Sequence, residues 1–342
     1  MNAAVLAPRG RTSTKKAVKL PEHIVEVISD SGEGAQRCGQ AFASIAARSG
    51  NGIWTVEIIP AEIQPPARSV AGASGIRIRV GSKQVTNGGD ETDLVVAFNE
   101  QVLLGRVRAG ELKQGATILL ENMWGEHRDP VIARTYSEGV KALQDAGFRV
   151  IALPLEKECR ALMSDARRGK NMFVLGVLAS IYSLDLQLAR DQIALTFGKK
   201  DQKVIDSNVR LMEAGHAWGE ANLDFKYEIP AEKAKVPQIV VNGNTAVALG
   251  VLASGMDICA MYPITPATSA SHYLSECFER VGGILHQAED EIAACAFAIG
   301  ASYAGRCAVT ITSGPGYSLK QEGIGLAVMA EIPLVVVNVM RG

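Results

Sequence analysis

The stretch IVEVISDSGEGAQ, residues 24–36, decides the fold of the first half of the chain. An apolar run at residues 24–28 leads into Gly32-Glu33-Gly34, and small and apolar residues follow at 38–47. This order predicts a strand, a tight glycine turn and a helix. Such a turn places the amides of a helix N-terminus where a phosphate or another anion can approach them.

The same alternation continues outward from this stretch. Predicted strands follow at residues 54–59, 76–80, 94–98, 117–121 and 149–153, and predicted helices at 171–184 and 201–214. Because helix-length spacers separate the strands, we expect parallel pairing with right-handed crossovers. The first part of the chain is therefore predicted to be a Rossmann-like α/β domain.

A second α/β pattern begins near residue 238. Its predicted helices are 244–253, 269–281 and 290–303, and its predicted strands are 258–262, 284–287, 308–313 and 334–340. The last of these is almost continuously apolar, as is typical of a parallel strand buried on both faces. A doubly wound parallel sheet is expected, and the end of the chain two residues after this strand suggests that the domain is truncated.

Composition sets the remaining boundaries. The 342 residues carry a net charge of −1, and five basic residues but no acid lie in the first twenty. We expect a disordered basic tail at 1–21, a first domain at 22–225, a linker at 226–237 and a second domain at 238–342. Balanced charge and 5% aromatic residues argue against nucleic-acid binding. No apolar run is long enough to span a membrane. The six dispersed cysteines are typical of reduced thiols, so a cytoplasmic location is expected.

The six cysteines lie far apart and form no Cys-x-x-Cys pair, so neither a zinc site nor an iron–sulfur site is predicted in this chain. The glycine turn allows three interpretations. It is a structural strand-to-helix turn, a contact for an anionic ligand, or an NAD site, and the last is disfavoured because Arg37 stands where a full Gly-x-Gly-x-x-Gly motif has its third glycine.

The second domain carries a denser group of motifs. Tyr262-Pro263-Ile264-Thr265-Pro266 follows a predicted strand, and its prolines stiffen the turn. Glu289, Asp290 and Glu291 begin a helix rich in small residues, where helix capping is the simpler explanation for acids. Ser313-Gly314-Pro315-Gly316 and Arg341 follow two further strands. A parallel sheet would gather Thr265, Glu291, Ser313 and Arg341 at one edge, as a binding site requires.

These motifs, in this order, resemble the α part of the 2-oxoacid:ferredoxin oxidoreductases. The matching features are Tyr-Pro-Ile-Thr-Pro, Glu-Asp-Glu-Ile-Ala-Ala with its Gly-Ala-Ser-x-Ala-Gly stretch, Thr-Ser-Gly-Pro-Gly and an apolar strand ending in Arg-Gly. Residues 22–225 resemble the γ domain of the same family, fused in front, through the glycine turn and residues 93–99. The fused order is most similar to that of 2-oxoglutarate:ferredoxin oxidoreductases, also called 2-oxoglutarate synthases.

The resemblance implies a role for each residue of the motifs. Glu291 matches the carboxylate that holds the aminopyrimidine ring of thiamine diphosphate, and Glu289 is the alternative if the register differs. Thr265 and Arg341 match the groups that contact the substrate carboxylate. Tyr262, Pro263, Ile264, Ser313 and Gly314 are expected near the cofactor. Gly32, Glu33 and Gly34 are candidate contacts for an anion or for coenzyme A.

The resemblance also implies partners. The expected reaction is the CoA-dependent oxidative decarboxylation of a 2-oxoacid, most simply 2-oxoglutarate to succinyl-CoA, with reduction of ferredoxin. Thiamine diphosphate would be shared with a β subunit that also carries Mg²⁺ and a [4Fe-4S] cluster, in an (αβ)2 assembly. Three alternatives stay open: pyruvate or a branched 2-oxoacid as substrate, a nucleotide-binding scaffold, and a non-catalytic assembly subunit.

Overall fold

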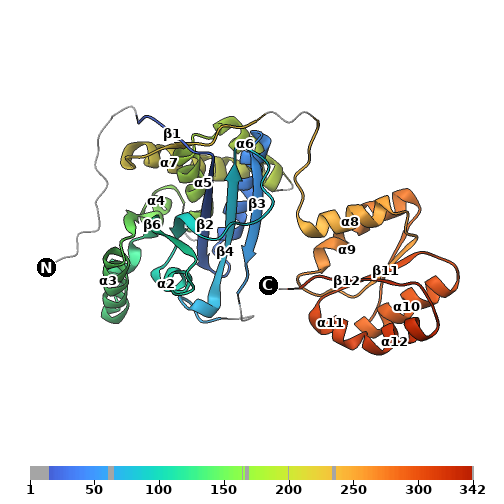
Figure 1. Cartoon of the computed structure of the whole chain (residues 1–342). Helices are drawn as coiled ribbons and strands as arrows, with labels where there is room; N and C mark the ends of the chain where they lie inside the picture. The colour runs from blue at the N-terminus through green and yellow to red at the C-terminus, as the bar shows by residue number, and fades with distance from the viewer. Residues whose placement is uncertain are drawn as a thin grey trace. The chain divides into compact units, whose positions relative to one another are not determined.

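The computed structural model describes residues 15–60, 65–163, 165, 169–198, 200–232 and 236–340. The chain divides into two compact units, Met1–Gln238 and Ile239–Gly342 (Figure 1). Each unit is a sheet covered by helices, so the predicted α/β class is confirmed. Residues 226–237, predicted as a linker, fall within the first unit.

A mixed sheet forms the centre of the first unit. In the described residues its strand order is β3-β4-β2-β5-β6-β7. The strands are β2 (Glu22–Asp30), β3 (Gly52–Ile58), β4 (Ala73–Gly81), β5 (Thr92–Ala97), β6 (Leu112–Glu121) and β7 (Arg149–Leu153). Strands β2, β5, β6 and β7 are parallel, as predicted from their helix-length spacers.

The prediction of parallel pairing is wrong for β4, which runs antiparallel to both of its neighbours, β2 and β3. The connection from β3 to β4 contains a single described short helical turn, Val70–Gly72, rather than a crossover helix. Without such a crossover the chain reverses, so β4 returns between β3 and β2. Its Ile76 and Ile78 face the core, and Arg77 pairs with buried Glu26 on the opposite face.

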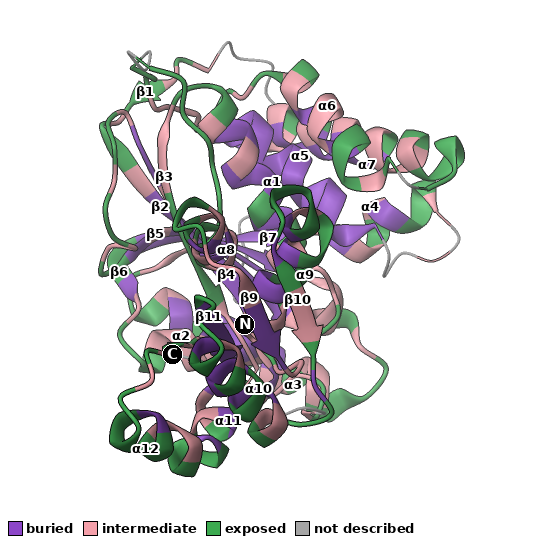
Figure 2. Ribbon diagram, turned by 90° about the vertical axis from the view of Figure 1, so that its right-hand side faces the viewer, coloured by how far each residue is buried: buried purple, intermediate pink, exposed green. Residues whose placement is uncertain are grey.

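Helices cover both faces of this sheet (Figure 2). On one face lie α1 (Ala35–Arg48), α4 (Leu155–Leu162), α5 (Lys170–Ile181), α6 (Leu186–Phe197) and α7 (Gln202–Asn222), and on the other lie α2 (Glu100–Arg108) and α3 (Pro130–Asp145). The chain turns to opposite sides after β2 and after β5. These two neighbouring strands therefore form a topological switch point, where α/β sheets usually bind ligands.

The predicted disordered tail is partly ordered. Strand β1 (Val18–Lys19) pairs in parallel with β8 (Tyr227–Glu228), and Lys15 Nζ donates to the carbonyl of Gly219 at 3.2 Å. Both short strands belong to the first unit. Residues 1–14, the rest of the predicted tail, lie outside the described residues.

The second unit contains a fully parallel sheet with the order β10-β9-β11-β12 in its described part. The strands are β9 (Ile258–Met261), β10 (Ile284–Gln287), β11 (Ala308–Thr312) and β12 (Val335–Asn338). The helices are α8 (Gly243–Ala253), α9 (Thr268–Cys277), α10 (Glu291–Tyr303), α11 (Gly314–Leu319) and α12 (Gln321–Met329). Helices α8 and α9 pack on one face, and α10 and α12 on the other.

Strand β12 is shorter than the predicted strand at residues 334–340. Its neighbour in the described residues is β11 alone, and Val335 at the edge is 43% exposed. Among the described residues, no helix has the length and apolar content that crossing a membrane requires.

Candidate active site

Three turns meet at the carboxyl edge of the second sheet. Residues 262–267 follow β9, residues 288–290 follow β10, and Ser313 follows β11. The strands are parallel and in direct register, with Met261 opposite both Gln287 and Ile311. From β9 the chain adds β10 on one side, and it then adds β11 and β12 on the other side. The strand order thus reverses between β9 and β11, so the carboxyl edge at this point is the expected ligand-binding edge of the unit.

Glu291 is the first residue of α10. The side chain of Asp290 caps the helix by accepting a hydrogen bond from the Ala293 amide at 2.7 Å, so the capping expected for this acidic cluster is carried out by Asp290. Glu289 is exposed, whereas Glu291 is half-buried. The Glu291 carboxylate has no hydrogen-bond partner among the described residues. It is therefore available to a ligand.

The backbone of α11 lies against the Glu291 side chain. A Cβ atom on Gly316 would come within 2.2 Å of Thr312 Oγ1 and within 2.8 Å of Glu291 Cγ. Only glycine allows this close approach, so Gly316 makes the space that the Glu291 side chain occupies. The sequence had indicated the glycines of this turn, but not their contact with the acid 25 positions earlier.

Lys320 lies beneath the first turn of α10 and was missed by the sequence analysis. Its side chain is buried, with 1% of the residue exposed, and Nζ donates to the Glu291 carbonyl at 2.7 Å and to Thr310 Oγ1 at 3.2 Å. A signal existed in the sequence, since Lys320 is the sole charged residue between positions 308 and 321.

The turn after β9 contains Tyr262, Pro263 and Ile264, all half-buried, and Thr265, which is exposed. The Thr265–Pro266 peptide bond is cis. Asn244 at the start of α8 donates to the Pro266 carbonyl at 2.8 Å and thereby ties the turn to that helix. The Thr265 side chain thus projects from a fixed turn on the same edge as Glu291.

The turn after β11 contains Ser313, which is buried and precedes α11, and Gly314. A Cβ on Gly314 would lie 3.2 Å from the sulfur of Met340, so the end of the described chain runs beside this turn. Arg341, the predicted partner of a substrate carboxylate, lies outside the described residues. The structure therefore gathers Thr265, Glu291 and Ser313 on one edge and leaves the prediction for Arg341 untested.

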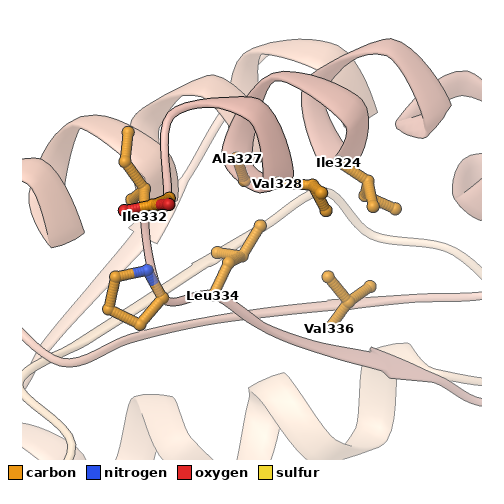
Figure 3. Close-up of a pocket in the computed structure, with 8 residues that line it drawn as sticks. Ile324, Ala327, Val328, Ile332, Leu334 and Val336 are labelled. Atoms are coloured by element: carbon orange, nitrogen blue, oxygen red, sulfur yellow. The ribbon is translucent and has the colours of Figure 1, made fainter.

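An apolar groove lies elsewhere in the same unit, between α12 and β12 (Figure 3). It has a volume of about 380 Å³ and is lined by Ile324, Ala327, Val328, Glu331, Ile332, Pro333, Leu334 and Val336. None of the predicted site residues lines it. The described residues also contain no group of three acidic, His or Cys side chains placed to hold a metal ion.

In the first unit, the glycine turn lies at the switch point between β2 and β5. Gly32 and Gly34 both have positive φ, 88° and 89°, which favours glycine. A Cβ on Gly34 would also come within 2.9 Å of Asn171 Nδ2, while that of Gly32 would meet open space. Helix α1 has neither a side-chain cap nor an acid in its first turn. Its first amides are thus free of side-chain capping.

Acidic groups surround this turn. Glu33 accepts from the Asp30 amide and lies 3.7 Å from the ammonium of Lys170, which is also 3.2 Å from Glu156 and 3.9 Å from Glu121. Burial raises the pKa of Glu121 to about 7, while Lys170 acts in the opposite direction. Glu33 is therefore half-buried and lies close to a buried lysine. Its pKa is likewise raised by burial.

Two models of known families match this chain. The model described as pyruvate ferredoxin/flavodoxin oxidoreductase matches residues 26–218, more than half of the chain. The chain belongs to this family. A second model, described as the thiamine diphosphate-binding part of pyruvate flavodoxin/ferredoxin oxidoreductase, matches residues 249–342, which include the Glu291 edge. The family resemblance inferred from the motifs is confirmed.

Curated members of the oxidoreductase family are similar over different shares of the chain. The 2-oxoglutarate oxidoreductase subunit KorA of Mycobacterium tuberculosis is 33% identical over 341 residues, which are 95% of this chain and 51% of that protein. The ketoisovalerate oxidoreductase subunit VorB of Methanothermobacter thermautotrophicus is 49% identical over 102 residues, 30% of this chain and 29% of that protein. The chain spans about half the length, or less, of the curated relatives it matches.

Among solved structures, the 2-oxoglutarate:ferredoxin oxidoreductase of Magnetococcus marinus, with 2-oxoglutarate, coenzyme A and succinyl-CoA bound, is similar with a TM-score of 0.76. The two share 30% sequence identity, and the match covers 94% of this chain and 53% of that one. The likeness extends over both units of this member of the family.

Proposed function

We propose that this chain is the fused γ–α subunit of a 2-oxoglutarate:ferredoxin oxidoreductase, which converts 2-oxoglutarate and CoA to succinyl-CoA and CO₂ and reduces ferredoxin. The observation that carries the proposal is the unpartnered Glu291 carboxylate at the carboxyl edge of a sheet that matches a thiamine diphosphate-binding family model. Two relatives that match nearly the whole chain, at 95% and 94% coverage, are both named for 2-oxoglutarate.

The residues at this edge fit the aminopyrimidine ring of thiamine diphosphate. When bound, thiamine diphosphate supplies a carbon nucleophile for a 2-oxo group. Glu291 would hold a proton against a ring nitrogen and so favour the imino tautomer, because a carboxyl group can donate to that nitrogen. Gly316 leaves the space for this carboxyl group. Tyr262, Pro263, Ile264, Ser313 and Gly314 would line the ring.

Thr265 would donate a hydrogen bond to the substrate carboxylate, since this residue is exposed on the same edge. Arg341 would pair with that carboxylate through its guanidinium group. In the first unit, Gly32, Glu33 and Gly34 would contact CoA. Support comes from the start of α1, which has neither a side-chain cap nor an acid in its first turn.

The proposed complex requires a second polypeptide. A β subunit would supply Mg²⁺ and a [4Fe-4S] cluster, because the sequence has no cysteine pattern for a cluster. An (αβ)2 assembly in the cytoplasm, with ferredoxin as electron acceptor, completes the proposal.

The first test replaces Glu291 by Ala in the assembled enzyme. Because the carboxyl group activates the cofactor, we expect a loss of nearly all 2-oxoglutarate decarboxylation, measured as CO₂ release. Glu276→Ala, an exposed acid on α9, is the matched control and should keep the wild-type rate. Normal turnover by Glu291→Ala contradicts the proposal, and a selective loss in Glu289→Ala would move the role to Glu289.

The substrate is tested separately. Matches of 102 residues connect this chain both to a relative named for 2-oxoglutarate and to one named for ketoisovalerate, so these short matches leave the substrate open. Because relatives that match nearly the whole chain are named for 2-oxoglutarate, we expect kcat/KM to be highest for 2-oxoglutarate among 2-oxoglutarate, pyruvate and ketoisovalerate. A higher value for pyruvate or ketoisovalerate would keep the reaction type and replace the substrate.

A further inference from the structure

Lys320 is a buried cation without a paired carboxylate. No ion pair of its ammonium within 4.0 Å is found among the described residues, and its two acceptors are neutral oxygens, the Glu291 carbonyl and Thr310 Oγ1. Burying a charge without a counter-charge costs stability. Burial accordingly lowers the pKa of Lys320, although the fields of Cys295, Glu291 and Asp290 oppose that shift.

The position of the ammonium increases this cost. It lies at the N-terminal turn of α10, where the helix dipole disfavours a cation. The lysine is therefore not explained by a paired carboxylate, and an apolar side chain of similar length would avoid the cost of burying a charge. A buried charge that is bound by neutral oxygens calls for an explanation in function.

The hydrogen bonds of Lys320 connect three elements. The residue lies between α11 and α12, Thr310 is a fully buried residue of β11, and Glu291 is the first residue of α10. Helix ends fray unless something holds them. The ammonium ties the carbonyl of Glu291 to the centre of the sheet and so fixes the backbone from which the Glu291 side chain projects.

We propose that Lys320 is a positioning residue, which fixes the backbone of Glu291 and thereby the place of its carboxyl group against the aminopyrimidine ring. This inference rests on the proposed function. It predicts that loss of the ammonium impairs cofactor binding and catalysis while leaving the fold intact, which is the reverse of what a stabilising residue would show.

The test is Lys320→Met in the assembled enzyme, since methionine keeps the length of the side chain and removes the charge. We expect the melting temperature without cofactor to be unchanged or higher, because a buried charge is removed. The Kd for thiamine diphosphate with Mg²⁺, measured by fluorescence titration, should rise at least about 10-fold. We expect kcat to fall on the order of 100-fold, the scale that a small misplacement of a reacting group can cost.

Ser302→Ala is the matched control. Ser302 lies near the other end of α10 and donates to the Pro333 carbonyl, so its loss should lower the melting temperature and leave the Kd for thiamine diphosphate unchanged. If Lys320→Met raises the Kd only together with a loss of melting temperature as large as that of Ser302→Ala, the residue is structural and the inference is wrong. A wild-type Kd in Lys320→Met also overturns it.

Two further variants keep the test decisive. Thr310→Val preserves the shape and charge of the side chain but removes one hydrogen-bond acceptor of the Lys320 ammonium. The Kd of this variant for thiamine diphosphate should therefore rise several-fold. A wild-type Kd in Thr310→Val contradicts the inference even if Lys320→Met does not fold. Glu291→Ala separates the two proposals. Normal cofactor binding and turnover in Glu291→Ala would refute the proposed function. If Glu291→Ala loses turnover while Lys320→Met keeps wild-type cofactor binding and turnover, the role of Lys320 alone is refuted.

Discussion

Among the residues that the structure describes, one lysine is buried in each unit, and the two differ in their partners. Lys170 is within 4.0 Å of three carboxylates, whereas Lys320 is bound by neutral oxygens. The first arrangement offsets the burial of charge with opposite charge, and the second does not. The same residue type thus has a structural explanation in the first unit and calls for a functional one in the second.

Lys170 should control the ionisation of Glu121. Burial raises the pKa of Glu121 to about 7 and Lys170 opposes this, so Lys170→Met should raise that pKa further. An acid whose pKa is raised by folding stabilises the protein most at low pH, and this contribution is lost as the pH rises through the folded-state pKa. In Lys170→Met that loss should move to higher pH.

Carboxyl ¹³C NMR titration of Glu121 measures this shift. Lys113→Met, which removes an exposed lysine paired with Asp93, should leave the Glu121 titration unchanged. A Glu121 pKa that falls in Lys170→Met would show that the charge of Lys170 is not what stabilises the Glu121 carboxylate.

At the scale of the elements, α5 and α7 touch through their backbones. A Cβ on Gly176 would come within 1.9 Å of the Met212 carbonyl, and one on Gly215 within 1.9 Å of the Phe173 carbonyl. Every residue of α5 is buried. These glycines therefore allow an entirely enclosed helix to approach its neighbour at the shortest distance.

Gly176→Ala should destabilise the first unit by about 1–3 kcal/mol, because the added methyl group overpacks the contact of α5 with α7. Gly250→Ala in the exposed part of α8 has nothing within 4 Å of the new Cβ and should be neutral or stabilising by about 0.5–1 kcal/mol. Denaturant unfolding curves of the two variants measure both values. Equal effects would show that the close contact does not limit the side chain at position 176.

The sequence predicted the type of most elements, because strand and helix periods are local properties. The first and last residues of β7 and β10 agree with the predicted ranges, residues 149–153 and 284–287. The direction of β4 could not be predicted in the same way, since it depends on a connection without a crossover helix. The exposure of β12 depends on which strands flank it, which its own apolar sequence does not reveal.

The residues of the candidate site that lie in sequence motifs were predictable, but the contacts between distant residues were not. Motif order indicated Glu291, Thr265 and Ser313, and the structure gathers them on one sheet edge. Gly316 and Lys320 contact Glu291 from positions 25 and 29 residues further along the chain, and such contacts come from the packing of α10 against α11 rather than from any local pattern.

At the scale of the whole molecule, each unit has its own ligand-binding edge, so ligands should protect them separately. We expect thiamine diphosphate with Mg²⁺, added to the assembled enzyme, to slow amide hydrogen exchange at residues 262–266, 291–295 and 313–320. CoA should slow exchange at residues 32–38 instead. Bound ligands stabilise the regions that they contact, which is why exchange is the measurement of choice.

Residues 141–147, at the end of α3 in the first unit, serve as the internal control and should exchange at the same rate with either ligand. If thiamine diphosphate left the second unit unprotected and NAD protected the turn at Gly32 to Gly34, the nucleotide-binding scaffold would replace the present proposal.

The pairing of β1 with β8 joins the two ends of the first unit in sequence. Val18 meets Tyr227 across about 200 residues of chain. At roughly 5–20 residues per second, a ribosome needs on the order of 10–40 s to make that length. Until β8 has been synthesised, β1 has no partner strand. The pairing of β1 with β8 therefore forms only after nearly all of the first unit has been made.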